Sequence, residues 1–347
     1  MAEYQLIVGD EVIDKTFAKT TNLASSLLGA SILGCSDEWF AEASNLLTPT
    51  APIHRPGVFV HTGAWYDGWE TRRHNPGEYD WVVIKLGVPS GSIEAIEVDT
   101  AYFVGNFGEK VLVEAATNID DAEAVKPEIN GWNTILPIQE CGPSQRRAWK
   151  LPKATEPITH VRVRMYPDGG FARVRLYGHV VPPPRPANAS DLEELSSALV
   201  GGLSLGASDE HFTPASNIIL PGRGINMGDG WETKRSRGAD HVDWAIIALG
   251  LPGSIGRLDI DTKDFRGNFP REVRVHAFQS TNGVDPEHDD AGWVEVLSDK
   301  KTGPDAIHTF DRDVLNPEAL GKTFTHVKLT LVPDGGVKRF RVFGTRS

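Results

Sequence analysis

The sequence is poor in cysteine and has no long apolar run. Its two cysteines, Cys35 and Cys141, stand outside any paired spacing such as C-x-x-C. Because two such residues cannot form a disulfide framework, we expect reduced thiols. Residues 1–7 lack the basic region and apolar run of a signal peptide, and no later stretch is apolar enough to span a bilayer. The sequence therefore predicts a cytoplasmic protein without a membrane segment.

Positive charge is also scarce. Lysine and arginine together number 35 against 47 aspartates and glutamates, which gives a net charge of -12. Such a surface repels nucleic acids and anionic membranes unless basic residues cluster tightly, so we expect neither as a partner. Any anionic ligand must be met by local arginines. The sequence has no H-E-x-x-H motif and no clustered His/Cys spacing, so the metal and cofactor content stays open.

Helical periodicity is nearly absent, whereas strand patterns are frequent. In Val161–Tyr166 the alternation is strict and places the arginines on the face opposite to the apolar side chains. Many short runs of this kind, separated by turn residues, predict an all-β protein of the jelly-roll sandwich type. Trp81 and Trp244 are expected in the core. The clearest helical candidate is 191–199, where Ser190 and Glu193 have the spacing of a capping box.

An internal repeat sets the domain organisation. The sequence Gly-Trp-Glu-Thr occurs at Gly68–Thr71 and again at Gly230–Thr233, within a similarity of about 160 residues. The offset between the copies falls from 172 (Gly34 to Gly206) to 162 (Gly68 to Gly230), so the first copy carries ten extra residues between Asn45 and Asp67. Two long copies indicate a duplicated domain and not a solenoid.

These observations predict three segments. A first β-sandwich occupies 1–181, with an N-terminal extension. A proline-rich linker and the short helix occupy 182–199. A second β-sandwich occupies 200–347.

Several motifs resemble known families. Ser44–Asn45, Asp67–Gly68, Thr71 and the strand 80–87 resemble the discoidin or galactose-binding type of jelly roll. A more specific resemblance, which covers nearly the whole chain and its duplication, is to the allantoicase family and within it to the fungal enzymes. It is carried by Phe40–Asn45, Pro49–Ile53, Phe59–His61, Gly63–Asn75, Cys141–Arg146 and Tyr166–Gly170.

The resemblance implies the hydrolysis of allantoate to ureidoglycolate and urea, a step of purine and allantoin catabolism for nitrogen use. Allantoate carries one carboxylate and two ureido groups on a single carbon. Its hydrolysis needs a cation for the carboxylate, acceptors for the ureido N–H groups, an acid for the departing urea and a base for water. A metal hydroxide could also supply the nucleophile.

The repeated loop offers residues for these roles. Glu70 lies beside Arg72 and Arg73 in the sequence, and we interpret Glu70 as a catalytic carboxylate and the two arginines as substrate-binding. Asn106 is a candidate partner of a ureido group, with a turn asparagine as the alternative. The corresponding candidates in the second copy are Glu232, Lys234 and Arg235. An internal salt bridge that braces each loop is the alternative interpretation.

The extra segment makes the copies unequal, because it contains His61, which has no counterpart in the second copy. We predict that His61 is a catalytic acid or base, with a surface histidine as the alternative. His54 and His74 are weaker candidates, and Arg146 and Arg147 are secondary anion-binding candidates. The first copy is therefore expected to supply the proton-transfer group, while the second serves as scaffold or contributes cations.

A different class of function also fits the sequence. The chain could be a non-catalytic tandem module of the galactose-binding type that holds a small ligand or carbohydrate. The charged, repeated loop favours a small charged metabolite such as allantoate, and an assay for urea release separates the two readings. Residue patterns do not decide between a monomer and a homo-oligomer.

Overall fold

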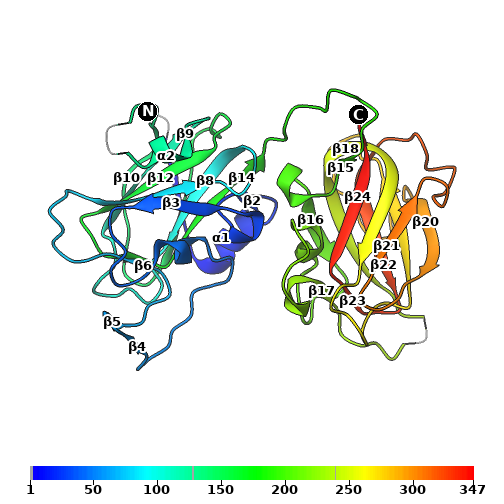
Figure 1. The fold of residues 1–347 in the computed structure, drawn as a ribbon, viewed down its shortest axis with the longest axis horizontal. Helices are drawn as coiled ribbons and strands as arrows, with labels where there is room; N and C mark the ends of the chain where they lie inside the picture. The colour runs from blue at the N-terminus through cyan, green and yellow to red at the C-terminus, as the bar shows by residue number, and fades with distance from the viewer. Residues whose placement is uncertain (1–2, 127–128, 239) are drawn as a thin grey trace. The chain divides into compact units, whose positions relative to one another are not determined.

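The computed structural model describes residues 3–126, 129–238 and 240–347. The chain divides into two units, Met1–Val181 and Pro182–Ser347. The regular secondary structure of each unit consists mainly of strands, and all pairs between named strands are antiparallel within the described residues (Figure 1). The predicted all-β class with two β-sandwich repeats is therefore confirmed.

Two five-stranded sheets make up the first unit. One sheet has the order β1-β11-β8-β14-β2, and the other has the order β10-β9-β12-β7-β3. The strands of the first sheet are β1 (Gln5–Val8), β2 (Thr21–Asn22), β8 (Gly91–Asp99), β11 (Arg146–Lys150) and β14 (Arg173–Val180). Those of the second are β3 (Ser31–Cys35), β7 (Asp80–Lys85), β9 (Lys110–Ala116), β10 (Asn133–Glu140) and β12 (His160–Tyr166).

Short elements complete the first unit. Helix α1 (Asp10–Thr16) follows β1, and helix α2 (Asp121–Ala124) follows β9. Strand β6 (Trp69–Glu70) pairs with β13 (Gly170–Phe171), and β4 (Phe59–Val60) pairs with β5 (Gly63–Ala64).

The second unit repeats this plan with one continuous long strand. Strand β18 (Asp243–Asp261) pairs with β22 (Phe324–Val332) and β16 (Leu203–Ala207) along its first part. Along its second part it pairs mainly with β24 (Arg339–Arg346) and β21 (Ile307–Asp311). It thus covers the positions that β7 and β8 occupy in the first unit. The remaining strands are β15 (Glu193–Glu194), β17 (Trp231–Glu232), β19 (Glu272–Phe278), β20 (Val294–Lys301) and β23 (Gly336–Val337).

The repeated tryptophans separate into buried and partly exposed pairs. Trp69 and Trp231 are completely buried, so the repeated loop is anchored on a core side chain. The prediction that Trp81 and Trp244 are core residues is wrong, because both are only partly buried. Asp80 and Val82 on either side of Trp81, and Asp243 and Ala245 on either side of Trp244, are buried, and strand alternation turns the indoles to the opposite face.

The predicted helix at 191–199 is also wrong. Glu193–Glu194 forms strand β15 against Gly344 and Phe343, and only Ala198–Val200 is helical, as a 3₁₀ turn. The side chain of Glu194 pairs with Arg341 at 2.6 Å, and Glu193 pairs with Arg346. Pairing with a distant strand therefore outweighs the local capping pattern.

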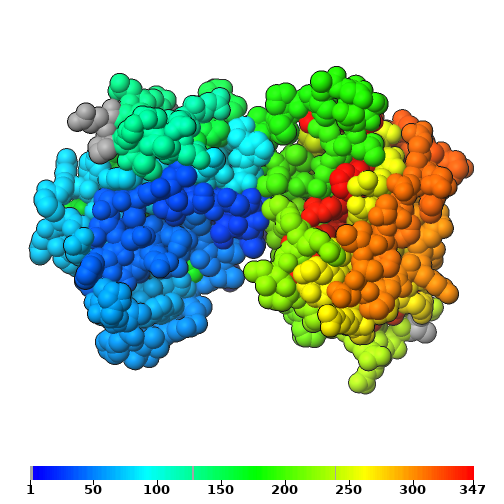
Figure 2. Space-filling view, in the orientation of Figure 1, coloured from blue at the N-terminus to red at the C-terminus, as the bar shows by residue number. Residues whose placement is uncertain are grey.

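The register of the two copies locates the extra residues. The backbone N–H of Ile53 donates to Asp67 Oδ2 at 2.8 Å, and the N–H of Ile225 donates to Asp229 Oδ2 at 2.6 Å. The extra residues of the first copy therefore lie between Ile53 and Asp67. This segment contains the β4–β5 hairpin and projects from the first unit (Figures 1 and 2).

Candidate functional site

The repeated loop is held rigidly on its sandwich. The indole N–H of Trp69 donates to the Asp37 carbonyl at 2.7 Å, and Thr71 Oγ1 accepts from the Gly169 N–H at 3.2 Å. Gly68 approaches β13 so closely that an added Cβ would lie 2.5 Å from the Phe171 carbonyl oxygen. This position accepts only glycine. The loop thus presents Glu70, which lies between the anchored Trp69 and Thr71, from a fixed backbone.

Glu70 forms the centre of the first-copy site, which we call the Glu70 site and define by Glu70, Arg73 and Asn106. Its side chain is buried, and Oε1 accepts a 2.6 Å hydrogen bond from Asn106 Nδ2. Burial raises the pKa of Glu70, whereas the Asn106 hydrogen bond and the charge of Arg73 act in the opposite direction. Arg73 donates through Nη2 to the Gly105 carbonyl at 2.7 Å. The structure therefore brings together three of the predicted residues.

The second copy repeats the central contact. Glu232 Oε1 accepts from Asn268 Nδ2, and Trp231 Nε1 donates to the Asp209 carbonyl at 2.8 Å. Glu232 is only partly buried, and Arg235 is exposed. The second copy therefore holds a more open version of the same arrangement.

Arg72 and Lys234 occupy a different position from Arg73. Arg72 binds Asp37 through Nε at 3.1 Å and through Nη2 at 2.8 Å, and it lies 5.2 Å from the centre of the Trp39 ring. Lys234 pairs in the same way with Asp209 at 3.3 Å. These contacts match the bracing alternative, since both cations are held by a carboxylate of their own unit.

The predicted histidines lie at three separate places. His61 is exposed at the β4–β5 hairpin, with its ring 6.4 Å from that of Trp39 in edge-to-face geometry. It lines a surface hollow of about 680 Å³ together with Trp39 and Tyr66, and neither Glu70 nor Arg73 lines this hollow. His54 stacks on Tyr102 at 4.9 Å, and the backbone N–H of His74 donates to Asp168.

The secondary candidates Arg146 and Arg147 point to different partners. Arg146 forms ion pairs with Glu97 at 2.9 Å and with Asp14 at 2.7 Å. Arg147 donates to the Glu140 carbonyl at 2.6 Å. The sequence pointed to Arg146 but not to its partner Glu97, since nothing in a strand pattern distinguishes a buried carboxylate from an exposed one.

The Glu70 site can bind and polarise a small ligand. A buried carboxylate accepts N–H groups and can take a proton from water, while the amide of Asn106 fixes its orientation. The remaining N–H groups of Arg73 form no hydrogen bond elsewhere among the described residues, so they can face an anion. No group of three or more His, Cys, Asp or Glu side chains in the described part of the chain could hold a metal ion. Within the same residues, no helix is long and apolar enough to cross a membrane.

Comparison with known proteins defines the family. The family model described as the allantoicase repeat matches residues 21–181 and 193–347. The chain is 55% identical over 339 residues to an allantoicase of Neurospora crassa, with 96% of this chain and 94% of that protein covered. It is 45% identical to an allantoicase of Saccharomyces cerevisiae, with 94% of each chain covered.

A solved structure gives the same result. The match to the crystal structure of allantoicase from Saccharomyces cerevisiae has a TM-score of 0.83 and 41% sequence identity. It covers 98% of this chain and 100% of the yeast chain. The sequence resemblance to fungal allantoicases is therefore confirmed. The chain belongs to the allantoicase family.

Proposed function

We propose that the Glu70 site of the first unit carries out the reaction of this allantoicase, the hydrolysis of allantoate to ureidoglycolate and urea. The activity follows from family membership, with 55% identity to an allantoicase over nearly the whole chain. The protein is accordingly a hydrolase of the amidinohydrolase type. The proposal concerns which residues perform the reaction and in which copy.

One observation carries the proposal. Glu70 is 8% exposed, and no lysine, arginine or histidine nitrogen among the described residues lies within ion-pair distance of its carboxylate. A buried carboxylate without an ion pair lowers stability, and such groups are concentrated at functional sites. The second copy does not share this burial, because Glu232 is partly exposed.

The reaction assigns a role to each residue. The second ureido nitrogen of allantoate helps to expel urea, and the central carbon becomes an imine-like cation that water attacks. Glu70 accepts a ureido N–H and takes the proton of the attacking water. Arg73 holds the substrate carboxylate through its free N–H groups. One C–N bond breaks, one C–O bond forms, and the departing urea receives a proton.

His61 is the proposed source of that proton. It stands on the hairpin that the second copy lacks and lines a hollow that neither Glu70 nor Arg73 lines, so the proposal requires the hairpin to bring His61 to the bound substrate. Because the departing and the attacking groups need opposite proton transfers, two different residues suit the reaction better than two equivalent ones. The first copy is therefore the proposed catalytic copy. The second copy is proposed to act mainly as scaffold, and Glu232, Lys234 and Arg235 are the charged residues of its repeated loop.

A matched pair of variants tests the assignment. In an assay of urea release from allantoate, Glu70→Gln should lower turnover by roughly 10²–10⁴-fold, the range for a lost acid–base group. Glu232→Gln, its counterpart in the second copy, should retain most of the activity. Normal turnover in Glu70→Gln would remove Glu70 from the reaction. Folded wild-type protein that releases no urea would favour the non-catalytic binding module.

The proposal also includes the organisation and location of the enzyme. Residues 182–192 are proposed as the connection between the repeats, because the compact units divide after Val181 and the second family repeat begins at 193, so the end of the predicted segment 182–199 belongs to the second repeat. A cytoplasmic location agrees with Cys35 and Cys141, which are both free thiols. Cell fractionation with an antibody against the chain tests the location.

A further inference from the structure

A comparison of the two copies reveals a carboxylate that is paired in one and unpaired in the other. Asp99 and Asp261 end the equivalent strand segments. In the first copy Arg173 Nε donates to the Thr50 carbonyl at 3.1 Å, and in the second Arg339 Nε donates to the Gly222 carbonyl at 3.0 Å. The residues that follow these carbonyls therefore also correspond. Ala51 occupies the position of Arg223.

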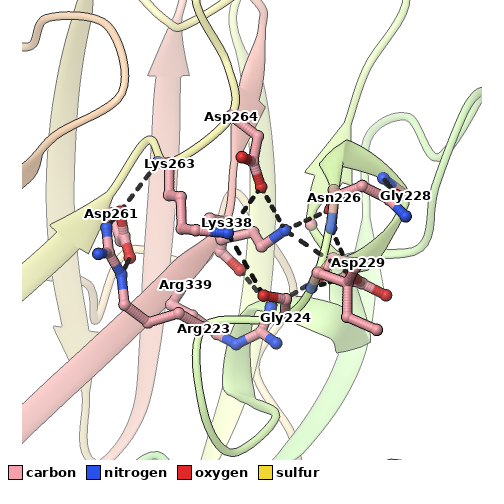
Figure 3. A network of polar contacts seen from close by, with 12 residues as sticks. Arg223, Gly224, Asn226, Gly228, Asp229, Asp261, Lys263, Asp264, Lys338 and Arg339 are labelled. Carbon is pink, nitrogen blue, oxygen red and sulfur yellow. Dashed lines mark hydrogen bonds and ion pairs between the residues drawn. The ribbon is translucent and has the colours of Figure 1, made fainter.

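In the second copy, Arg223 fills the space in front of Asp261. Its guanidinium binds the Asp261 carboxylate as a fork, with Nε 2.7 Å from Oδ2 and Nη2 2.9 Å from Oδ1. Lys338, which is completely buried, reaches Asp264 at 2.9 Å. Figure 3 shows these charged side chains together around the end of β18. The second copy thus neutralises its carboxylates with cations of its own.

The first copy lacks three of the four cations of this network, Arg223, Lys263 and Lys338, and keeps the fourth, Arg339, as Arg173. The N–H of Ala101 donates to Asp99 Oδ1 at 2.7 Å, as the N–H of Lys263 does to Asp261 Oδ1 at 2.9 Å. The N–H of Ala172 donates to the Asp99 carbonyl at 2.7 Å, as that of Lys338 does to the Asp261 carbonyl at 2.7 Å. The matched alanines Ala51, Ala101 and Ala172 therefore replace Arg223, Lys263 and Lys338.

A cavity lies where the Arg223 side chain would be. Its volume is about 530 Å³, and its lining includes Ala51, Ala101, Asp99, Tyr102 and Arg175. Asp99 is 2% exposed and has no ion pair among the described residues, although the charged residues Glu97, Arg146 and Arg175 lie nearby. The first copy therefore keeps the acceptor and omits the internal donor.

The geometry in the second copy indicates which ligand fits this acceptor. A guanidinium offers two parallel N–H bonds in one plane to the two oxygens of a carboxylate. A ureido group, –NH–CO–NH₂, is also planar and offers two N–H donors with the same separation across one carbon. In the second copy, the guanidinium of Arg223 lies in front of Asp261. The equivalent position in the first copy, in front of Asp99, is the one that a ureido or guanidino group of a ligand would take.

The cavity also contains a cation for the other end of such a ligand. Arg175 lies 3.8 Å from Glu97 and forms a long 3.4 Å hydrogen bond to the Thr50 carbonyl, so its N–H groups are only weakly engaged. Arg146 is held more firmly, by Glu97 and Asp14. Asp10 and Asp14 also line the cavity, which favours a ligand with donors over a simple anion. A small carboxylate with an N–H fork meets both requirements.

We propose that this cavity of the first unit binds a small carboxylic acid that carries a ureido or guanidino group, with the N–H fork on Asp99 and the carboxylate facing Arg175. The ureido source rests on the proposed function, since allantoate and ureidoglycolate are both ureido acids. A guanidino acid is the other source of the same chemistry. The site is separate from the Glu70 site, whose three defining residues do not line this cavity.

Calorimetric titration of the intact protein tests the proposal with two probes, ureidoacetate and guanidinoacetate. Ureidoacetate has a single nitrogen on its central carbon, so it cannot lose urea by the route that allantoate follows. We expect at least one probe to bind with one molecule per chain. Ala51→Arg, which introduces the internal donor of the second copy, and Asp99→Asn should each weaken binding by roughly 10- to 100-fold.

The matched control is Asp261→Asn in the second copy, which should leave probe binding unchanged. Thermal denaturation verifies that each variant is folded, and Asp99→Asn serves as the shape-preserving variant if Ala51→Arg does not fold. Binding of ureidoacetate identifies the substrate or product as the natural ligand, and binding of guanidinoacetate alone identifies a guanidino acid. Binding of neither probe, or equal binding by wild type and both variants, overturns the proposal.

The failure of this site and the failure of the proposed function give different results. If wild-type protein releases urea from allantoate but binds neither probe, the proposed function stands and the proposed binding site at Asp99 is refuted. If the protein releases no urea but binds guanidinoacetate in an Asp99-dependent manner, the proposed binding site stands and the proposed function is refuted.

Discussion

The substitution Asp99→Asn should stabilise the protein at neutral pH. Burial raises the pKa of Asp99 to about 6 from its usual 3.8, and the nearby Glu97 adds to the effect, whereas the Ala101 N–H opposes it. An asparagine has nearly the same shape and can keep the Ala101 hydrogen bond, but it carries no charge into the interior. The variant therefore removes the cost of the buried charge with little change in packing.

The sign and magnitude follow from the difference between the two pKa values. Because the folded-state pKa lies above the unfolded-state value, the folded protein favours the protonated carboxyl. The resulting stabilisation is complete below about pH 3.8 and is lost as the pH rises through about 6. At about 1.36 kcal/mol for each pKa unit, the ionised form costs about 3 kcal/mol at neutral pH. At pH 7.5 the unfolding free energy of Asp99→Asn should exceed that of wild type by most of this amount. At pH 4 the two unfolding free energies should differ little.

Denaturant unfolding at several pH values measures the difference, and Asp261→Asn provides the matched control. Asp261 is paired with Arg223, whose side chain is 48% exposed, so the loss of this pair should destabilise the protein by about 1 kcal/mol. The same substitution at equivalent positions should thus change stability in opposite directions. The reasoning is refuted if Asp99→Asn is less stable than wild type from pH 4 to pH 8, or if both variants shift the unfolding free energy in the same direction.

Three further predictions concern the Glu70 site and its surroundings. Arg73→Lys keeps the charge but loses the two parallel N–H donors of the guanidinium. The fall in kcat/KM for allantoate should correspond to about 1.5–3 kcal/mol of transition-state binding. Unchanged kinetics with a lower melting temperature would show that Arg73 serves only folding. Arg72→Ala removes the exposed brace to Asp37 and should lower the melting temperature slightly with kcat/KM unchanged, whereas a large kinetic loss would place Arg72 on the substrate. His61→Gln should lower turnover by roughly 10²–10⁴-fold and remove one limb of the pH–rate profile, and a wild-type profile would show that the hairpin is structural.

Much of the fold could be predicted because the same strand pattern occurs in both copies of the internal repeat. The strict alternation of Val161–Tyr166 appears in the structure as β12, with Val161, Val163 and Met165 fully buried. Alternation is a local property, so the sequence shows it directly. The segment 191–199 failed for the opposite reason. Its capping pattern is local, whereas Arg341 and Arg346, which hold Glu194 and Glu193 in a strand, lie about 150 residues away.

The candidate site was predictable in composition but not in contacts. The repeat singled out Glu70 and Asn106, yet their hydrogen bond joins residues that are 36 positions apart. Arg72 and Arg73 are chemically alike and adjacent, so composition could not separate their roles. The chain turns at Arg73 and His74, and the two arginines reach different partners, Arg72 to Asp37 and Arg73 to the Gly105 carbonyl.

The correspondence of Ala51 with Arg223 could not be found without the backbone register. Sequence alignment located the extra residues of the first copy only between Asn45 and Asp67, and within that interval Ala51 had no assigned counterpart. The hydrogen bonds from Arg173 to Thr50 and from Arg339 to Gly222 fix the correspondence. A contact that both copies share is therefore what exposes the residue in which they differ.

This difference indicates how the duplicated domain diverged. Two identical copies would carry the same buried carboxylate, with the same cost of burying its charge. The second copy offsets that cost at Asp261 with Arg223, whereas the first leaves Asp99 unpaired and raises its pKa to about 6. Buried titratable groups with strongly shifted pKa values cluster at functional sites. An unpaired Asp99 at the position where the second copy supplies Arg223 therefore supports a ligand as the partner of Asp99.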